Sequence, residues 1–353
     1  MGELMEYLKR AVHDGASDLF FVAGGPVSEK IEGQICPLRE EKLLPPESST
    51  LIQEIFQLAD RSQETYLRDG DDDFSFAVSG LARFRVNTYR QRGSMAAVIR
   101  IVAFEIPDWQ EYHISEEVMK LSGLRSGMVL FAGTAGSGKS TTQACLIDRI
   151  NKTRSCHIVT LEDPIEFLHR NQKSIISQRE IAVDTQDFLS GLRACLRQAP
   201  DVIQLGEMRD IQTIQTAMTA AETGHLVLAT LHTQGAVHSI NRVIDVFPAG
   251  QQEQIRMQLS TVLRTVVSQQ LILDKSGEMV PAFEIMHLND AIRTHIRERK
   301  VHQMTAALAA GASEGMITMD QSILHLYQAG SIDAETALKY AENREQMLRR
   351  MGG

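Results

Sequence analysis

The segment at residues 133–140 constrains the fold more than any other part of the sequence. It reads Gly-Thr-Ala-Gly-Ser-Gly-Lys-Ser and matches the G-x-x-x-x-G-K-[S/T] pattern of a phosphate-binding loop. The apolar run 128–132 before it predicts a buried strand, and the apolar spacing within 141–150 predicts a helix. Strand, glycine loop and helix in this order are what the pattern requires, so we expect an α/β domain that binds a nucleoside triphosphate.

The residue types in this loop suit the binding of phosphate groups. Glycines let the backbone N–H groups turn inward without Cβ clashes, and the helix N-terminus adds partial positive charge. Lys139 is expected to reach the β- and γ-phosphates of ATP, and the Ser140 hydroxyl is expected to hold Mg²⁺. The candidate nucleotide-binding residues are Gly133, Thr134, Ala135, Gly136, Ser137, Gly138, Lys139, Ser140 and Thr141.

The composition limits the classes of partner and compartment. The 353 residues include 36 basic and 45 acidic side chains, a formal charge of −9, so we expect no nucleic acid as the main partner. The four cysteines form no C-x-x-C pair, which favours a reducing compartment and no zinc site. The N-terminal residues lack the features of a signal peptide, and no run of about 18 apolar residues is present. We therefore expect a cytoplasmic enzyme.

The hydrophobic pattern predicts four regions. Residues 1–103 are typical of a small α+β domain, and residues 104–115, which include Pro107, are typical of a linker. Residues 116–273 alternate apolar strands with amphipathic helices, which indicates a parallel sheet covered on both faces. Residues 274–353 mix acidic and basic side chains and predict a helical region.

Individual elements follow from the local periodicity. The first region predicts strands at 19–22 and 30–37 (the latter turning at Gly33), a helix at about 46–68 and a hairpin of 74–78 with 82–89. The third region predicts strands at 128–132, 157–161, 202–205 and 226–230, and helices at 185–197 and 211–223.

Three carboxylates, Glu162, Asp163 and Glu166, follow the predicted strand 157–161. Carboxylates at a strand terminus suit the positioning of water and hydrogen bonding linked to a metal ion. An acidic surface loop explains the same residues equally well, so the residues alone leave both interpretations open.

Glu207 follows the predicted strand 202–205, which is typical of the acidic strand that completes a P-loop ATPase site. There it would polarise the attacking water. Gly206 stands where an Asp usually holds Mg²⁺, so contact with the metal would run through water. The alternative is a strand-end glutamate without a role, which the order of the two motifs disfavours.

Two histidines, His225 and His232, bracket the predicted strand 226–230, so we expect them at opposite ends of the strand. The two histidines are seven residues apart across a strand, and this separation is not the spacing of metal ligands. Each is either a phosphate sensor or a structural histidine, and the residues alone favour the structural interpretation.

Residues 83–100 contain five arginines and neither lysine nor an acid. Arg83 and Arg85 alternate with apolar residues and are expected to face away from the core. They could contact a neighbouring subunit's nucleotide or a nucleic acid, or form salt bridges with Asp71–Asp73, and the spacing does not choose among these. The arginines are Arg83, Arg85, Arg90, Arg92 and Arg100.

Taken together, these segments resemble the PilT-type ATPases that power type IV pilus retraction, within the secretion ATPase superfamily. The resemblance covers nearly the whole chain, and the combination of segments is highly specific. The matching segments are 15–19, 82–87, 91–94, the P-loop, 161–167, 178–180, 206–210, 221–226, 230–233 and 291–298.

The resemblance implies a PAS-like α+β N-terminal domain followed by a RecA-like P-loop ATPase domain with a C-terminal helical extension, assembled as a homohexamer. It implies ATP and Mg²⁺ as cofactors, an inner-membrane pilus platform protein and possibly other pilus ATPases as partners, and a peripheral position at the inner face of the cytoplasmic membrane. It also assigns roles to single residues. The acidic box is Glu162, Asp163 and Glu166, the catalytic glutamate Glu207, the histidine box His225 and His232, and the nucleotide-reaching arginines Arg85 and Arg100, with Arg83 and Arg92 matching less well.

The sequence departs from the family pattern in three places. Thr134-Ala135 stands where Pro-Thr is common, and Thr294-His295 stands where Asn-Leu is common. The Gln198-Ala199 pair is similar to the PilU paralogues, which are accessory retraction ATPases. An accessory ATPase of this type therefore remains an alternative.

Other functions compete with a retraction motor. Pilus-assembly and type II secretion ATPases usually carry extra N-terminal sequence and a four-cysteine segment, which we do not find here. A RecA-like nucleic-acid motor is disfavoured by the charge of −9, and an ATP-binding regulator by the presence of Lys139, Ser140 and Glu207.

Overall fold

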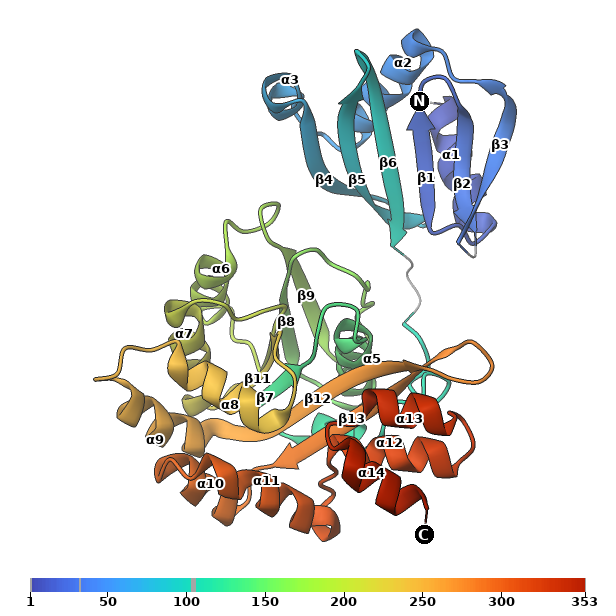
Figure 1. The fold of residues 1–353 in the computed structure, drawn as a ribbon. Helices are drawn as coiled ribbons and strands as arrows, with labels where there is room; N and C mark the ends of the chain where they lie inside the picture. The colour runs from blue at the N-terminus through green and yellow to red at the C-terminus, as the bar shows by residue number, and fades with distance from the viewer. Residues whose placement is uncertain (1, 32, 103–105, 353) are drawn as a thin grey trace. The chain divides into compact units, whose positions relative to one another are not determined.

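Figure 1 shows the fold in a computed structural model, which describes residues 2–31, 33–102 and 106–352. The chain forms two compact units, Met1–Glu105 and Ile106–Gly353. The predicted fold class is confirmed, because an α+β unit precedes an α/β unit whose C-terminal part is helical.

The first unit is an antiparallel six-stranded sheet in the order β3-β2-β1-β6-β5-β4, with apolar helix faces packed on it. Leu4 and Leu8, one helical turn apart on α1, share a core with Phe21 of β1 and Phe56 of α2. The elements are α1 (Gly2–His13), β1 (Asp18–Val22), β2 (Pro26–Ile31), β3 (Gln34–Lys42), α2 (Pro45–Leu58), α3 (Glu64–Asp69), β4 (Asp71–Val78), β5 (Ala82–Gln91) and β6 (Ser94–Val102).

Three details of this unit differ from the sequence prediction. The predicted helix 46–68 is two helices, because the chain leaves helical geometry at Asp60, where φ is +49°. There Arg61 turns away to make a two-bond ion pair with the buried Asp72. The predicted strand 30–37 is the end of β2 and the start of β3, joined around Gly33. The hairpin gains a third strand, β6.

The second unit contains a seven-stranded sheet in the order β13-β12-β7-β11-β10-β8-β9, in which every pairing is parallel except that of the edge strand β13. The strands are β7 (Gly127–Ala132), β8 (His157–Glu162), β9 (Ile175–Glu180), β10 (Val202–Leu205), β11 (Leu226–Leu231), β12 (Leu263–Leu273) and β13 (Met279–His287). The helices are α4 (Glu116–Lys120), α5 (Lys139–Thr153), α6 (Phe188–Cys195), α7 (Ile211–Glu222), α8 (Ala236–Asp245), α9 (Gln252–Val262), α10 (Asp290–Arg297), α11 (Val301–Ala310), α12 (Met319–Gln328), α13 (Ala334–Tyr340) and α14 (Arg344–Met351).

Both faces of this sheet are covered, which explains its apolar strands. Alternate residues of β7 enter different cores. Met128 and Leu130 pack with α6 to α11, whereas Val129 and Phe131 pack with α4 and α5. The strands predicted at 128–132, 157–161, 202–205 and 226–230 agree with β7, β8, β10 and β11 to within one residue at each end.

Two boundaries differ from the predicted regions. The region predicted to be helical from residue 274 begins with strand β13, whose residues 280–286 are all buried. Pro281 is tolerated there because β13 is an edge strand.

Residues 104 and 105 of the predicted linker lie outside the described residues. In its remaining part, Ile106 and Trp109 pack against the core beneath α5, and the Pro107 carbonyl accepts a hydrogen bond from Cys145.

Helices α12 to α14 pack against β12 and β13 and bring three carboxylates together. Glu284 of β13 is buried, and its carboxylate accepts the backbone N–H groups of Ala236 and Met319, at the starts of α8 and α12. Burial, together with the carboxylates of Glu284 and Asp320, raises the pKa of Glu342 to about 6. Burial raises the pKa of Glu284, and the hydrogen bonds from the N–H groups of Ala236 and Met319 oppose that effect.

We expect Glu342→Gln to stabilise the protein at neutral pH. The raised pKa means that the folded state binds more protons than the unfolded chain between about pH 4.5 and 6, so stability falls as the pH rises through this window. The variant should gain about 1 kcal/mol at pH 7.5, a magnitude reduced for solvent screening, and less at pH 5. Denaturation midpoints at both pH values measure this. Glu335→Gln, at an exposed position of α13, is the control, and a gain independent of pH would contradict the explanation.

Candidate functional site

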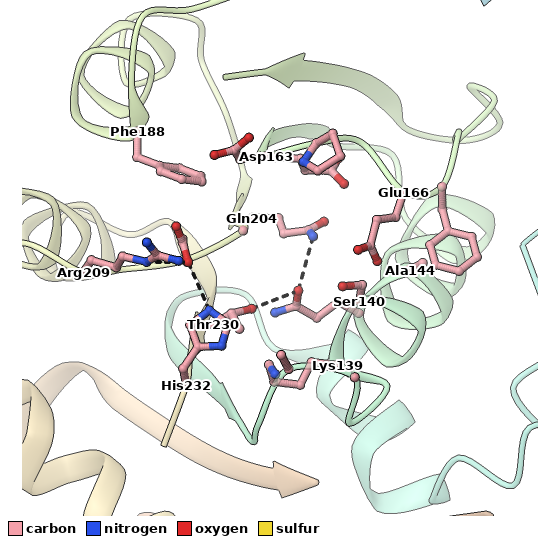
Figure 2. Close-up of a pocket in the computed structure, with 18 of the residues that line it drawn as sticks. Lys139, Ser140, Ala144, Asp163, Glu166, Phe188, Gln204, Arg209, Thr230 and His232 are labelled. Atoms are coloured by element: carbon pink, nitrogen blue, oxygen red, sulfur yellow. Dashed lines mark hydrogen bonds and ion pairs between the residues drawn. The ribbon is translucent and has the colours of Figure 1, made fainter. Parts of the chain in front are cut away.

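A cavity of about 360 Å³ lies at the carboxyl ends of the central parallel strands, where ligands of open α/β sheets usually bind (Figure 2). Polar and charged side chains from several loops converge on it. Its lining includes Ala135, Gly136, Lys139, Ser140, Gln143, Glu162, Asp163, Glu166, His169, Phe188, Gln204, Gly206, Glu207, Arg209, Thr230 and His232.

The glycines of the loop between β7 and α5 are required by a close backbone approach. A Cβ on Gly133, where φ is +148°, would lie 2.5 Å from the carbonyl oxygen of Gln269 in β12. A Cβ on Gly138, where φ is +84°, would lie 2.8 Å from the side-chain amide of the same residue. Helix α5 begins directly after Gly138 without a side-chain cap, so its first-turn N–H groups remain available to an anion.

Lys139 is buried, and its ammonium group donates to the carbonyls of Gly133 and Thr134 at 2.8 and 2.7 Å. Burial lowers the pKa of Lys139, and the negative charge of Glu166 opposes that effect. Ser140 is the next residue of the helix and is exposed to the cavity. The loop therefore holds a cation and a hydroxyl at the same helix terminus.

The structure brings the three acidic-box residues to the same cavity. Oε1 of Glu162 accepts hydrogen bonds from Thr160 Oγ1 at 2.6 Å and Gln178 Nε2 at 3.1 Å. Burial raises the pKa of Glu162, and these two hydrogen bonds act in the opposite direction. Asp163 and Glu166 are exposed, so their carboxylates are the accessible members of the group.

Glu207 follows β10 and is held by two partners. Its Oε2 lies 3.0 Å from Nε2 of His232, which follows β11, and 2.8 Å from Nε of Arg209. The neighbouring position has no room for a larger side chain without adjustment, because a Cβ on Gly206 would lie 3.2 Å from the Leu161 carbonyl oxygen. Glu207 is therefore the carboxylate that this strand presents to the cavity.

The two histidines lie at opposite ends of β11, as predicted, and of these two His232 lines the cavity. Nδ1 of His225 lies 2.9 Å from the carbonyl oxygen of Ala220, near the end of α7. His225 thus lies at the amino end of β11, whereas the P-loop follows the carboxyl end of the parallel strand β7.

Arg85 and Arg100 lie in the first unit, directly opposite each other on β5 and β6. Each has an aspartate partner: Arg85 pairs with Asp73 and Arg100 with Asp18, both at 3.0 Å. The salt bridge to Asp73 was one of the open interpretations, and it is present. Arg83 donates to Ser75 at 2.7 Å, and Arg92 lies in the turn between β5 and β6 with φ of +50°.

Several lining residues were missed by sequence analysis. Gln204 interrupts the apolar run of β10, and this interruption was a signal that could have been used. Phe188, Arg209 and Thr230 gave no signal apart from their neighbourhood. Burial lowers the pKa of His169 to about 4, so this histidine is neutral at physiological pH.

A glycine loop with a buried lysine, together with a glutamate that follows another strand of the same parallel sheet, defines a P-loop ATPase. The family model "Type II/IV secretion system protein" matches residues 3–352. The chain therefore belongs to this family, and within it the chain is a PilT-type ATPase.

Comparison with individual relatives supports this assignment to the PilT-type ATPases. The chain is 42% identical to the type IV pilus retraction ATPase PilT of Pseudomonas aeruginosa, over 96% of this chain and 98% of PilT. It is 36% identical to the type IV pilus ATPase PilU of the same organism, over 98% and 90% of the two chains. The crystal structure of the pilus retraction motor PilT with bound ADP superposes with a TM-score of 0.90 at 41% identity, covering 98% of each chain. In the described ranges, every helix is too short or too polar to cross a bilayer.

We expect Gly133→Ala to destabilise the second unit far more than Gly136→Ala. At position 133 the new Cβ meets a backbone carbonyl that cannot move alone, and a loss of about 3 kcal/mol or more is expected. At position 136, with φ of +75° and open space around the Cβ, the loss should be about 1 kcal/mol from backbone strain alone. Thermal denaturation of the two variants distinguishes them, and equal losses would contradict the clash.

Proposed function

We propose that this chain hydrolyses ATP with Mg²⁺ and uses the energy to drive retraction of a type IV pilus. The observation that carries the hydrolysis is the arrangement of Glu207. Its carboxylate is fixed by His232 and Arg209 on the same cavity that Lys139 and Ser140 line. A fixed carboxylate next to the expected γ-phosphate position can orient an attacking water.

The charged and hydroxyl residues of the P-loop and the acidic box then have roles in phosphoryl transfer. Lys139 exchanges its two carbonyl partners for phosphate oxygens, and the uncapped N-terminus of α5 binds the phosphate charge. Ser140 would hold Mg²⁺, which would supply positive charge to neutralise the phosphates. Glu162, Asp163 and Glu166 would accept hydrogen bonds from waters at the same site.

The donor set fits a metal that is held largely by substrate and water. Among the residues that the structure describes, no three His, Cys, Asp or Glu side chains are grouped to hold a metal ion. Mg²⁺ commonly keeps several waters and binds one or two protein ligands plus substrate phosphates. Gly206 is consistent with this arrangement, because a side chain there would crowd the Leu161 carbonyl oxygen, 3.2 Å from its Cβ.

We expect Glu207→Gln to bind ATP with little change in affinity and to lower turnover by about 10²–10⁴-fold, since the water loses its carboxylate. Lys139→Ala is the comparison, and it should lose most binding and most activity together because a charge-assisted phosphate contact is removed. Equilibrium titration with a fluorescent nucleotide and a phosphate-release assay measure the two quantities. A loss of affinity in Glu207→Gln equal to its loss of rate would make Glu207 a binding residue.

We further propose that the chain works as a homohexamer in which Arg85 and Arg100 serve a neighbouring subunit's nucleotide. Their aspartate partners keep both guanidinium groups in place on β5 and β6. We include His225 in the same proposal because it matches the histidine box of the family. It lies outside the cavity, so its proposed role is a contact with a neighbouring subunit. Light scattering with an ATP analogue measures the assembly, and a fully active monomer would contradict it.

The pilus function is supported by the relatives. PilT of Pseudomonas aeruginosa carries retraction in its name and matches more closely than PilU does. An inner-membrane platform protein, with other pilus ATPases as possible partners, and a peripheral position on the cytoplasmic face of the membrane follow from the same proposal.

Deleting the gene tests the direction of work. We expect cells with excess pili and no twitching, restored by the wild-type gene and not by Arg85→Ala or Glu207→Gln. Electron microscopy counts the pili, and a stab assay measures twitching. Cells without pili would indicate assembly, and piliated cells that still twitch would indicate an accessory ATPase.

A further inference from the structure

A buried pair of glutamines forms part of the cavity wall. Gln143 of α5 is 2% exposed and Gln204 of β10 is 6% exposed, and both line the cavity. Oε1 of Gln143 lies 3.3 Å from Nε2 of Gln204 and 3.3 Å from Oγ1 of Thr230 in β11. Figure 2 shows the dashed lines from Gln204 and Thr230 meeting at one amide oxygen. Three elements are thus joined at a single acceptor.

These contacts fix the orientation of the Gln143 amide and leave its nitrogen without a partner. Two donors converge on Oε1, so the oxygen faces β10 and β11 and the NH₂ group faces elsewhere. Within residues 2–31, 33–102 and 106–352, this buried Nε2 has no hydrogen-bond partner. A buried donor without an acceptor is destabilising, and one that lines a ligand cavity is explained by an acceptor that arrives with the ligand.

The position of Gln143 on its helix indicates which part of the ligand it meets. It lies four residues after Lys139 and three after Ser140, so the three side chains share one face of α5. Helical side chains lean toward the N-terminus of the helix, which directs the long Gln143 side chain toward these two residues.

The partners of Gln143 lie just before the residues of the opposite wall. Gln204 lies on β10, three residues before Glu207, which follows that strand. Thr230 lies on β11, two residues before His232, which follows that strand. The amide therefore lies between the residues expected to hold the phosphates and those expected to face the γ-phosphate and the water.

We propose that Gln143 is a positioning residue that distinguishes ATP from ADP. Its Nε2 donates a hydrogen bond on the γ-phosphate side of the bound triphosphate, to a phosphate oxygen or to a water held by it. Gln204 and Thr230 hold the amide in the orientation that presents this donor. The inference rests on the proposed ATP hydrolysis and adds a residue that selects the triphosphate.

A neutral donor suits this position electrostatically. Four carboxylates, Glu162, Asp163, Glu166 and Glu207, already line the cavity. An amide supplies a hydrogen bond to the triphosphate without further charge, and it is insensitive to pH over the physiological range. It also keeps its geometry, since both partners come from strands of the central sheet.

The test measures equilibrium binding of two fluorescent nucleotides in the presence of Mg²⁺. One nucleotide is a non-hydrolysable ATP analogue and the other is ADP. Gln143→Leu should weaken the analogue about tenfold and ADP less than twofold, because the lost bond is made only to the triphosphate side. Gln143→Met, which keeps the side-chain length, should behave the same way.

The double variant Gln143→Leu/Gln204→Leu separates a ligand role from a structural one. It replaces the amide pair with an apolar pair and leaves no unpaired buried amide, so it should fold even if the single variant does not. The Thr230 hydroxyl loses the same acceptor in both variants, so this loss cancels in their comparison. If Gln143 contacts the triphosphate side, the double variant still loses the discrimination between the two nucleotides. If the glutamines only satisfy each other, discrimination returns to the wild-type ratio, and the inference is overturned.

The same titrations separate failure of this inference from failure of the proposed function. A wild-type protein that binds neither nucleotide contradicts the ATPase proposal and this inference with it. A wild-type protein that binds both, with Gln143→Leu weakening the two equally or not at all, overturns only the role of Gln143. Melting temperatures of all variants identify any equal loss that comes from unfolding.

Discussion

The second unit depends on one close approach, that of the P-loop to strand β12. Gly133 and Gly138 both lie against Gln269, where a Cβ would meet atoms at 2.5 and 2.8 Å. The oxygen of the Gln269 side chain also accepts a hydrogen bond from Thr142 of α5 at 2.8 Å. These contacts place α5 in one position on the sheet. Because Lys139, Ser140 and Gln143 all lie on this helix, the phosphate side of the cavity is set by contacts with β12, a strand that never enters it.

The opposite side of the cavity is set by strand order. Strands β10 and β11 pair in parallel, with Leu205 next to Ala229, so their carboxyl ends lie at the same edge. Glu207 and His232, 25 residues apart in sequence, thereby come within 3.0 Å of each other. Loops alone hold such distances poorly, whereas hydrogen-bonded strands hold them well. The sheet therefore supplies the geometry that the chemistry needs, and the loops supply the side chains.

The same strand geometry explains how much the sequence predicts. Apolar runs identify β7, β8, β10 and β11, and polar residues at their carboxyl ends must share one edge. This places the carboxylates and His232 at one edge of the sheet, but the pattern alone left their roles open, and only the family resemblance assigned them to the nucleotide site. Strand β13 does not follow, because Pro281 and flanking polar residues hide a pattern that only edge pairing permits. The helix break at Asp60, where local backbone hydrogen bonds close α2, coincides with the ion pair of Arg61 with Asp72, which pattern analysis did not anticipate. Gln143 and Gln204 look like tolerated polar residues until the fold puts them in contact.

The glutamine pair contributes polar groups to the cavity wall without adding to the negative charge of its carboxylates. A carboxylate side chain at position 206 would crowd the Leu161 carbonyl oxygen, because its Cβ would lie 3.2 Å from that atom. It would also stand beside Glu162, whose pKa burial already raises. Each further buried anion costs more than the last, since the same low-dielectric surroundings must hold them all. Neutral amides avoid this cost and still offer a directed donor. Polar uncharged residues on the central strands are thus the electrostatically favoured way to build this wall.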